Sequence, residues 1–332
     1  MKIGFYIPYA SVNYSGGINV QGRMWAEGLR ELGHETYLLN NWDKFDYEHM
    51  DYIIILGIGK LVSDMVSICA PFKNLKLISA PIIDDNIPYW KYKLLSRIPV
   101  SKRLYGNPTF GYRKSINKFS YFLVRSEFEK QYLINCYGVS ESKIGTVPIS
   151  MRYTVFPEVD YARKENFCFH VSRLASPNKN VASLIEAAKK YKFNLKLAGT
   201  LNGKEQKEWL ASRIDGCSNI EYLGWLSEEE LARTYERAKA FALPSFTEGV
   251  GMVALEAAVY GSEIVMTNIG APKEYYEGRS VLVDPYDIDS IGNGVLEALN
   301  SKNSQPELRN YIINNYSTTV CMRKLEQILQ KI

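Results

Sequence analysis

Residues 240–261 read AFALPSFTEGVGMVALEAAVYG, and this stretch decides the fold class. The apolar run at its start predicts a buried strand, and the apolar residues from Met252 onward predict a helix. Gly249 and Gly251 stand between them, where a tight loop has to join the two elements. A strand, a glycine-containing loop and a helix in this order indicate an α/β protein with parallel sheets.

The same alternation continues along the chain on both sides of this stretch. Short β-branched and aromatic runs recur, and the segments between them have the apolar spacing of amphipathic helices. The predicted strands lie at residues 2–7, 36–39, 52–56, 75–79, 121–124, 144–148, 167–171, 195–199, 220–224, 240–244, 263–267 and 281–284.

The strand series restarts near residue 165, after a polar, proline-containing segment that is typical of a linker. We therefore predict two α/β domains, residues 1–150 and residues 151–305, with a cleft between them. Ligands of such sheets bind beyond the carboxyl ends of the strands. The tail, residues 306–332, has the pattern of a helix.

Composition excludes several classes of protein. A length of 332 residues fits about two domains, and a hydrophobic fraction of 46% is that of a globular chain. The net charge of +4 is too small to demand a nucleic-acid partner. No apolar run approaches the roughly 20 residues of a membrane span, and the first residues lack the apolar core of a signal peptide. We expect a cytoplasmic protein.

Cysteine and histidine usage argues against a metal centre. The five cysteines are scattered without a C-x-x-C pair, and the chain has three histidines. This usage argues against a disulfide framework and a structural zinc, and it excludes a histidine-rich metal site. Asp287 and Asp289 form a D-x-D pattern before an apolar-periodic segment, where helix capping is the favoured interpretation. Asp84 and Asp85 could bind a cation, but no third ligand is evident.

Two glutamates carry the strongest chemical signal. Glu248 precedes Glu256 by eight residues, so they could contact two polyol groups of one elongated ligand while loop N–H groups bind its phosphates. A glutamate near a helix start gains roughly 0.3–1 kcal/mol from the helix dipole without any function. Glu256, however, lies within an apolar run, where an ionised group is costly without partners. The functional interpretation is favoured.

Further candidates lie in loops that follow predicted strands. Arg173 and Lys179 could neutralise a diphosphate, with a solvated surface pair as the alternative. Gly16 and Gly17 open a helix where a phosphate could bind, with an ordinary strand–helix turn as the alternative. That segment does not have the G-x-G-x-x-G pattern of a dinucleotide site. Arg125 and Lys130 are interpreted as plain surface charges.

Taken in order, these segments resemble the retaining glycosyltransferases of the GT-B fold, in the large family four. TEGVGMVALEA resembles the E-x7-E signature of that family, and SRLASPNKNVASLIEA at 172–187 resembles its G-R-L…K-N…L-I-E-A segment. The segments at 15–39, 122–148, 222–249 and 268–299 also resemble family segments in the family's order. The resemblance therefore extends over most of the chain.

The resemblance implies two Rossmann-like domains whose parallel sheets face an interdomain cleft, with helix 306–332 crossing back to the first domain. It implies that Glu248 binds the donor sugar, that Glu256 binds the ribose, and that no metal or other cofactor is required. Arg173 and Lys179 resemble the pair that contacts the donor diphosphate. The remaining expected donor contacts are Gly16, Gly17, Trp225, Gly249, Val250, Gly251 and Met252.

The sequence departs from the family pattern at several positions. Many relatives carry a histidine after the fourth strand of the first domain, where this chain reads LISAPIIDDNIPYW. Asp84 or Asp85 could take over part of its role, so Asp84 joins Glu248, Arg173 and Lys179 as an expected catalytic residue. Residues 148–152 read PISMR where the family has P-N-G-V-D, residues 249–251 read GVG where it has G-F-G, and residues 261–264 read GSEI where it has G-T-P-V.

The expected function is retaining transfer of a hexose-type sugar from a nucleotide-diphosphate sugar. The acceptor would be a glycan, a lipid-linked glycan or another hydroxyl compound in cell-surface polysaccharide or glycoconjugate biosynthesis. Two alternatives stay open: a nucleotide-sugar 2-epimerase on the same fold, and a non-catalytic nucleotide-sugar-binding module. An epimerase would convert the donor into its 2-epimer, whereas a binding module would leave the donor unchanged.

Residues 86–120 are the basic part of the chain. They contain interleaved aromatic residues, no Asp or Glu, and eight basic residues: Lys91, Lys93, Arg97, Lys102, Arg103, Arg113, Lys114 and Lys118. This composition suits an anionic membrane surface or a lipid-diphosphate acceptor. Single-stranded nucleic acid and a solvated loop are the alternatives. We expect no nucleic-acid partner, and peripheral contact with the inner face of the membrane.

Overall fold

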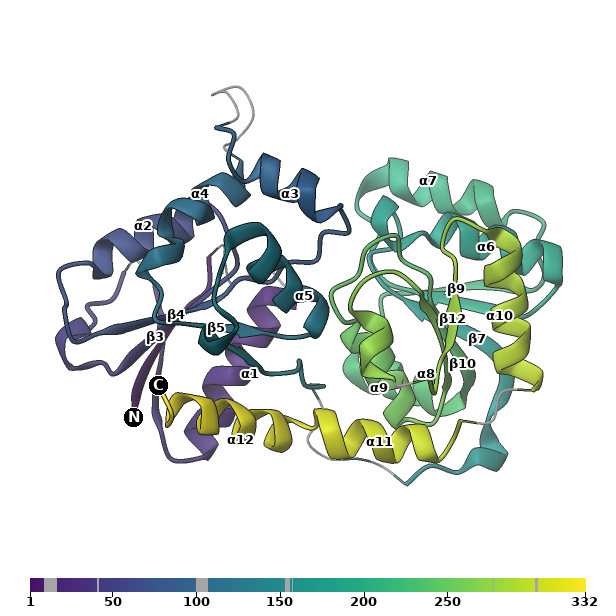
Figure 1. Ribbon diagram of the computed structural model, residues 1–332. Coiled ribbons are helices and arrows are strands. Elements are labelled where there is room, and N and C mark those ends of the chain that lie inside the picture. The colour runs from purple at the N-terminus through teal and green to yellow at the C-terminus, as the bar shows by residue number, and fades with distance from the viewer. Residues whose placement is uncertain are drawn as a thin grey trace. The chain divides into compact units, whose positions relative to one another are not determined.

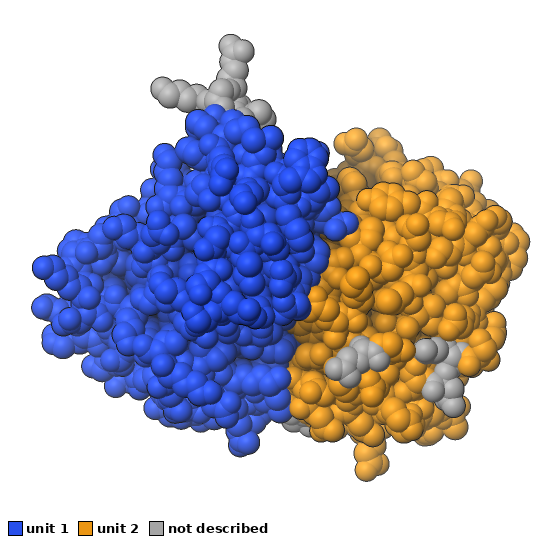
Figure 2. Space-filling model, viewed as in Figure 1, with its two compact units in different colours: residues 1–150, 318–332 blue, residues 151–317 orange. Residues whose placement is uncertain are grey.

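The computed structural model describes residues 1–8, 17–40, 42–99, 107–152, 156, 158–276, 278–301 and 304–332. The chain divides into two compact units (Figure 2). The first unit contains residues 1–150 and 318–332, and the second contains residues 151–317. Each unit is an α/β structure built around one six-stranded sheet (Figure 1).

The sheet of the first unit is parallel, in the order β2-β1-β3-β4-β5-β6. Its strands are β1 (Lys2–Tyr6), β2 (Glu35–Leu39), β3 (Tyr52–Leu56), β4 (Lys76–Ala80), β5 (Tyr121–Val124) and β6 (Ile144–Thr146). Its helices are α1 (Gly17–Glu31), α2 (Lys60–Cys69), α3 (Tyr89–Leu95), α4 (Pro108–Ser115), α5 (Glu127–Tyr132) and α12 (Thr318–Leu329).

The central strand β3 is buried along its whole length, which explains why its sequence, YIIIL, is apolar throughout. Successive side chains of a strand point to opposite faces. Ile53 and Ile55 therefore join one hydrophobic cluster, and Ile54 and Leu56 join another. Helix α12 supplies the second cluster with four buried residues: Cys321, Met322, Leu325 and Leu329. It lies beside α1 (Figure 1).

The sheet of the second unit is also parallel, in the order β12-β11-β10-β7-β8-β9. Its strands are β7 (Glu165–Val171), β8 (Leu195–Ala198), β9 (Ile220–Gly224), β10 (Ala238–Leu243), β11 (Glu263–Thr267) and β12 (Val281–Val283). Its helices are α6 (Val181–Tyr191), α7 (Gly203–Ile214), α8 (Glu228–Arg237), α9 (Met252–Val259), α10 (Ile288–Asn300) and α11 (Glu307–Tyr316).

The strand order of the second unit places a switch point between β7 and β10. From β7 the chain proceeds to β8 and β9 on one side, and then returns to β10 on the other side. The loops that follow β7 and β10 leave the sheet from neighbouring strands at the same edge. Open α/β sheets bind their ligands at such a position. These two loops carry Arg173, Lys179 and Glu248.

All twelve strands predicted from the sequence are present, with ends shifted by at most two residues. The single helix expected over 306–332 is instead two helices, and this prediction was wrong. Ser317 interrupts them with an extended backbone (φ −65°, ψ 150°). Helix α11 belongs to the second unit and α12 to the first. Among the described residues, no helix is both long and apolar enough to cross a membrane.

Candidate functional site

The loops after β7 and β10 are joined by polar side chains. Asn178 donates through Nδ2 to the Thr247 carbonyl at 2.7 Å, and its Oδ1 accepts from the Thr247 N–H at 3.0 Å. Buried Asn180 donates to the carbonyls of Pro244 and Pro285, at 3.0 and 2.7 Å. These bonds hold the two loops in one arrangement, so their charged residues have fixed neighbours.

Lys179 and Glu248 meet at this junction. The Lys179 Nζ lies 2.6 Å from Glu248 Oε2, and the side chains are 20% and 13% exposed. The Ser245 hydroxyl donates to the same carboxylate oxygen at 3.1 Å. The two residues that the sequence assigned to diphosphate and sugar therefore bind each other in a partly water-excluded position.

The glycine loop leads directly into helix α9. Gly251 has a positive φ of 76°, and a Cβ there would lie 2.9 Å from Leu243 Cδ2. A larger residue at this position is therefore both strained and crowded. Val250 is buried, while Gly249 and Met252 are partly exposed. The first N–H groups of a helix lack intrahelical partners, so α9 begins with donors beside Glu248.

The other expected donor contacts are less enclosed. The Arg173 side chain is exposed, and within the described part of the chain it has no ion pair or hydrogen bond. Trp225 is 70% exposed. Gly17 begins α1 in the first unit and is exposed, whereas Gly16 lies outside the described residues.

Glu256 lies apart from Glu248 and has protein partners. Its carboxylate is fully buried and binds Arg152 through both oxygens, Nε to Oε1 at 2.6 Å and Nη2 to Oε2 at 2.9 Å. The Tyr235 hydroxyl lies 3.4 Å from Oε2, and Arg152 Nη1 lies 2.9 Å from Glu228 Oε1. Burial raises the pKa of Glu256, and Arg152 opposes that rise.

The partner of Glu256 was missed by sequence reasoning. Arg152 lies 104 residues earlier, in the PISMR segment that departs from the family pattern. Because Arg152 compensates the burial of Glu256, that burial alone does not call for a ligand. The assignment of Glu256 to the ribose stays a prediction.

His170 is a further residue that the sequence did not single out. It is fully buried in β7, where Nδ1 lies 2.8 Å from the Ala242 carbonyl of β10 and Nε2 lies 2.7 Å from Ser172 Oγ. A lone histidine in an apolar strand, FCFHV, was the available signal. Burial, with a smaller effect of Lys179, lowers its pKa to about 4.

Asp84 is part of an ion-pair cluster in the first unit. Arg125 Nη2 lies 2.5 Å from Asp84 Oδ1, and Arg125 Nε lies 3.2 Å from Glu129 Oε2. Arg125 and Glu129 are buried, whereas Asp84 is 45% exposed. Burial opposes the charge of Arg125, but the two carboxylates outweigh it and raise its pKa. Burial and the neighbouring Asp84 raise the pKa of Asp85.

The interpretation of Arg125 as a plain surface charge was therefore wrong. Its guanidinium neutralises Glu129, whose Oε1 also accepts from the Ile83 N–H at 2.6 Å. Lys130 is also less exposed than expected, at 17%, and it pairs with Glu127 and Glu141. These contacts attach the Asp84 segment to α5, so the Asp84 carboxylate is held by Arg125.

Capping at Asp287 is confirmed, because its side chain accepts from the Asp289 N–H at the start of α10. Within the described ranges, no group of three or more His, Cys, Asp or Glu residues is arranged to hold a metal ion.

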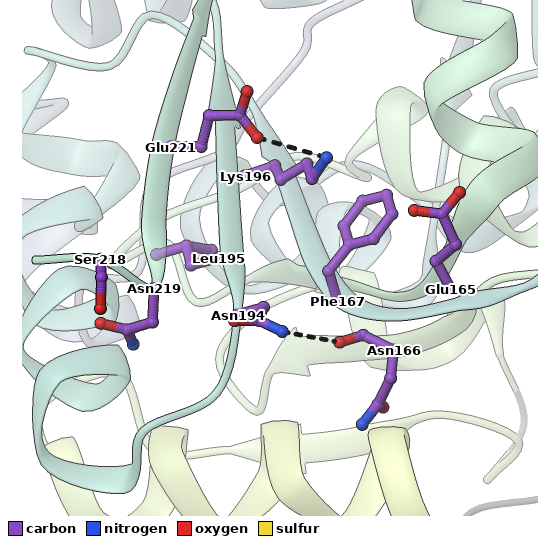
Figure 3. Close-up of a pocket in the computed structure, with 9 residues that line it drawn as sticks. All are labelled: Glu165, Asn166, Phe167, Asn194, Leu195, Lys196, Ser218, Asn219 and Glu221. Atoms are coloured by element: carbon purple, nitrogen blue, oxygen red, sulfur yellow. Dashed lines mark hydrogen bonds and ion pairs between the residues drawn. The ribbon is translucent and has the colours of Figure 1, made fainter.

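A hollow of about 320 Å³ lies at the opposite, amino-terminal edge of the second sheet (Figure 3). It is lined by residues from the starts of β7, β8 and β9 and from the turns before β8 and β9. Its polar groups bind one another: Lys196 pairs with Glu221 at 3.2 Å, and Asn194 donates to the Asn166 carbonyl at 3.4 Å. The loops after β7 and β10, with their convergent charges, are the better candidate site.

Comparison with known proteins identifies the family of this chain. Residues 154–318 match the model of the family described as Glycosyl transferases group 1. The chain belongs to this family. The matched region contains the β7 and β10 loops, the glycine loop and both glutamates, Glu248 and Glu256.

The relatives include the O-antigen chain mannosyltransferase B of Escherichia coli, 24% identical over 203 residues. That match covers 56% of this chain and 53% of the relative. An uncharacterized glycosyltransferase of Methanocaldococcus jannaschii is 32% identical over 162 residues, covering 48% of this chain and 41% of the relative. The chain spans about half the length of the curated relatives that it matches.

Solved structures confirm the fold. HepE of Anabaena, solved in complex with UDP and glucose, superposes with a TM-score of 0.75 over 100% of both chains at 14% identity. The sucrose-phosphate synthase of Thermosynechococcus elongatus gives a TM-score of 0.77 at 16% identity, covering 99% of this chain and 98% of that one. The group 1 chain therefore has the GT-B fold that the sequence predicted.

Proposed function

We propose that this chain is a retaining glycosyltransferase that transfers a hexose-type sugar from a nucleotide-diphosphate sugar. The acceptor would be a glycan, lipid-linked glycan or other hydroxyl compound in polysaccharide or glycoconjugate synthesis. The observation that carries the proposal is the Lys179–Glu248 pair beside the glycine loop. It lies at the switch point of the second sheet, within the region that matches the family.

Each part of this arrangement suits one part of the donor. Arg173, Lys179 and the N–H groups at the start of α9 would stabilise the diphosphate as negative charge develops on it. Lys179 would turn from Glu248 to the diphosphate, which leaves the Glu248 carboxylate to accept from sugar hydroxyls. The O-antigen mannosyltransferase and the UDP complex of HepE support this class of substrate.

In the proposed reaction, the bond between the anomeric carbon and the diphosphate oxygen breaks, and its electron pair leaves with the diphosphate. The acceptor hydroxyl forms the new bond from the same face, and its proton passes to a diphosphate oxygen. Protein cations can provide the charge stabilisation, so we propose that no metal is needed. NMR of the first product tests retention, and an inverted anomer would refute it.

The decisive experiment has two stages. A thermal-shift screen of UDP-, GDP- and ADP-sugars identifies the donor, because a ligand at 100 times its Kd adds about 2.7 kcal/mol of stability. Hydrolysis of that donor is then followed in Glu248→Gln. Loss of positioning should lower kcat roughly a hundredfold while Kd changes by less than about tenfold.

The control and the alternatives are part of the same assay. Glu208→Gln changes a 66% exposed acid on α7 and should leave both constants unchanged. Conversion of the donor to its 2-epimer would favour an epimerase. Donor binding with neither transfer nor hydrolysis in the wild type would favour a binding module.

We also propose that the first unit contacts an anionic membrane through a narrower surface than residues 86–120. Tyr92, Tyr112 and Phe119 are buried, and Arg113 donates to the Ser96 hydroxyl, so these side chains contact the first unit itself. Among the described residues of this stretch, the exposed large apolar side chains are Tyr89, Trp90, Leu94 and Ile98, with Lys91, Lys93 and Arg97 exposed among them. We call these seven residues the α3 patch.

The α3 patch combines the two attractions that a peripheral contact needs. Trp90, Leu94 and Ile98 follow at intervals of four residues and are 70%, 51% and 43% exposed. Each of the three cations would contribute about 1 kcal/mol at an anionic surface. Residues 100–106, with two further predicted cations at Lys102 and Arg103, lie outside the described residues.

A further inference from the structure

Ser172 directly follows β7, the strand that contains His170, and the hydrogen bonds of these two residues define which atom carries each proton. A backbone carbonyl can only accept, so the 2.8 Å contact with the Ala242 oxygen requires a proton on His170 Nδ1. The lowered pKa of His170 keeps the ring neutral near pH 7, so Nε2 has no proton. The 2.7 Å contact therefore runs from the Ser172 hydroxyl to Nε2.

The orientation of Ser172 is fixed by its backbone as well. Its N–H donates to the Ala198 carbonyl at 3.2 Å. Gly199 packs so closely that a Cβ there would lie 1.8 Å from the Ser172 carbonyl oxygen. His170 is fully buried, whereas Ser172 is partly exposed at the carboxyl end of β7. The hydroxyl oxygen thus has its proton directed inward and only lone pairs left for a ligand.

An oxygen with only lone pairs available attracts donors and repels other acceptors. Next to it in sequence is Arg173, and the charge of Lys179 acts on His170 from nearby. These cations suit the diphosphate of the donor, whose oxygens are acceptors. The groups joined to that diphosphate on its two sides are both polyols, the ribose and the transferred sugar. A hydroxyl of one of them is the partner that Ser172 can accept from.

We propose that His170 orients Ser172 as a hydrogen-bond acceptor for a hydroxyl group of the bound nucleotide sugar. Ser172 is then a specificity-determining residue, and His170 is a positioning residue that acts through it. This inference rests on the proposed function, and it concerns a position where the family pattern has glycine. It predicts that the protein distinguishes hydroxylated donors from their deoxy analogues at one defined group.

The first test reads the protons directly. NMR of ¹⁵N-histidine-labelled protein is simple to assign because the chain has three histidines, His34, His49 and His170. At pH 7 the His170 ring should be neutral and protonated at Nδ1. In Ser172→Ala, the Nε2 resonance should move as its hydrogen bond is lost. A charged ring, or a proton on Nε2, would overturn the proposal without any statement about activity.

The second test measures binding by titration calorimetry with UDP-glucose or GDP-mannose, whichever stabilises the wild type. Ser172→Ala should weaken binding roughly three- to tenfold, and Ser172→Thr, which keeps the hydroxyl, should restore it. The same loss should be absent for one deoxy analogue. If Ser172→Ala and the wild type bind the 2′- or 3′-deoxyribose analogue equally well, the hydroxyl that Ser172 contacts is on the ribose. If they bind a deoxy-sugar analogue equally well, that hydroxyl is on the transferred sugar.

The two proposals fail in different ways. If the wild type binds none of the UDP-, GDP- or ADP-sugars, the proposed function and this inference both fall. If it binds a donor but Ser172→Ala binds the donor and every analogue as tightly as the wild type does, only the role of Ser172 is refuted.

Discussion

The buried pair of Arg152 and Glu256 allows a stability prediction with a pH signature. Arg152→Met keeps most of the apolar stem but removes both hydrogen bonds to a carboxylate that is fully buried. Removing one partner of a buried ion pair costs about 3–5 kcal/mol. Arg152 itself is 31% exposed, so water can replace part of the loss. We expect Arg152→Met to lower the free energy of unfolding by about 3 kcal/mol at pH 8.

The loss should be smaller at low pH. Burial raises the pKa of Glu256 above 4.5, and Arg152 is the main group that opposes this rise. Without Arg152 the folded-state pKa rises further, so the native state binds a proton that the unfolded state releases. The free energy of unfolding then falls as pH rises from 4.5 through the folded pKa. The variant is therefore destabilised less at pH 5.5 than at pH 8.

Urea unfolding at pH 5.5 and pH 8 provides the assay, with hydrogen-exchange mass spectrometry to read residues 151–317 separately. Arg152→Met with Glu256→Gln should regain much of the stability at pH 8, because no charge is left buried. Arg163→Met, at an 85% exposed arginine, should stay within about 0.5 kcal/mol of the wild type. A loss below 1 kcal/mol at pH 8, or no recovery with Glu256→Gln, would refute the reasoning.

Three further perturbations test other parts of the structure. Lys164→Met removes donor bonds from Nζ to the carbonyls of Tyr235, Ala238 and Tyr260 at the ends of α8 and α9. It should cost about 2–4 kcal/mol in urea unfolding, and Lys204→Met, on an exposed side chain, should cost almost nothing. The pKa of His170 falls from 6.5 to about 4 on folding. Its contribution to the free energy of unfolding is therefore complete above pH 6.5 and is lost as pH falls toward 4. That contribution is roughly 3 kcal/mol. In His170→Gln, the free energy of unfolding should therefore fall less steeply between pH 6.5 and pH 4 than in the wild type, and an unchanged slope would contradict the assignment. Wild-type protein should co-sediment with phosphatidylglycerol vesicles in preference to phosphatidylcholine vesicles. Trp90→Ser with Leu94→Ser should abolish the preference, whereas Trp42→Ser, at an 85% exposed tryptophan outside the α3 patch, should retain it.

The sequence predicted the strands well because a parallel sheet covered on both faces needs strands that are apolar throughout. YIIIL in β3 is the clearest case, since its five residues are all buried. The glycine loop before α9 was also predictable, because a φ of 76°, as at Gly251, strongly favours glycine. The functional segment after β10 was therefore found before its surroundings were known.

The partners of the charged residues could not be predicted in the same way. Arg125 binds Asp84 across 41 residues, and Arg152 binds Glu256 across 104 residues. Such pairs depend on which loops the tertiary structure brings together, and no periodicity records that. The family pattern gave no help at Arg152, because the chain departs from it there. Likewise, the sequence shows Tyr92 and Tyr112 only as aromatic residues of a basic stretch, but on α3 and α4 their side chains are buried in the core.

Helix α12 has a consequence for the order in which the chain can be assembled during synthesis. The first unit needs Cys321, Met322, Leu325 and Leu329 to complete the cluster around Ile3, Phe5 and Ile54. A ribosome has to add the 167 residues of 151–317 before it reaches them. At 5–20 residues per second, this takes roughly 10–30 s. The unit that is made first is therefore finished last, and a nascent chain that stops before α12 leaves an apolar face open to chaperones and proteases.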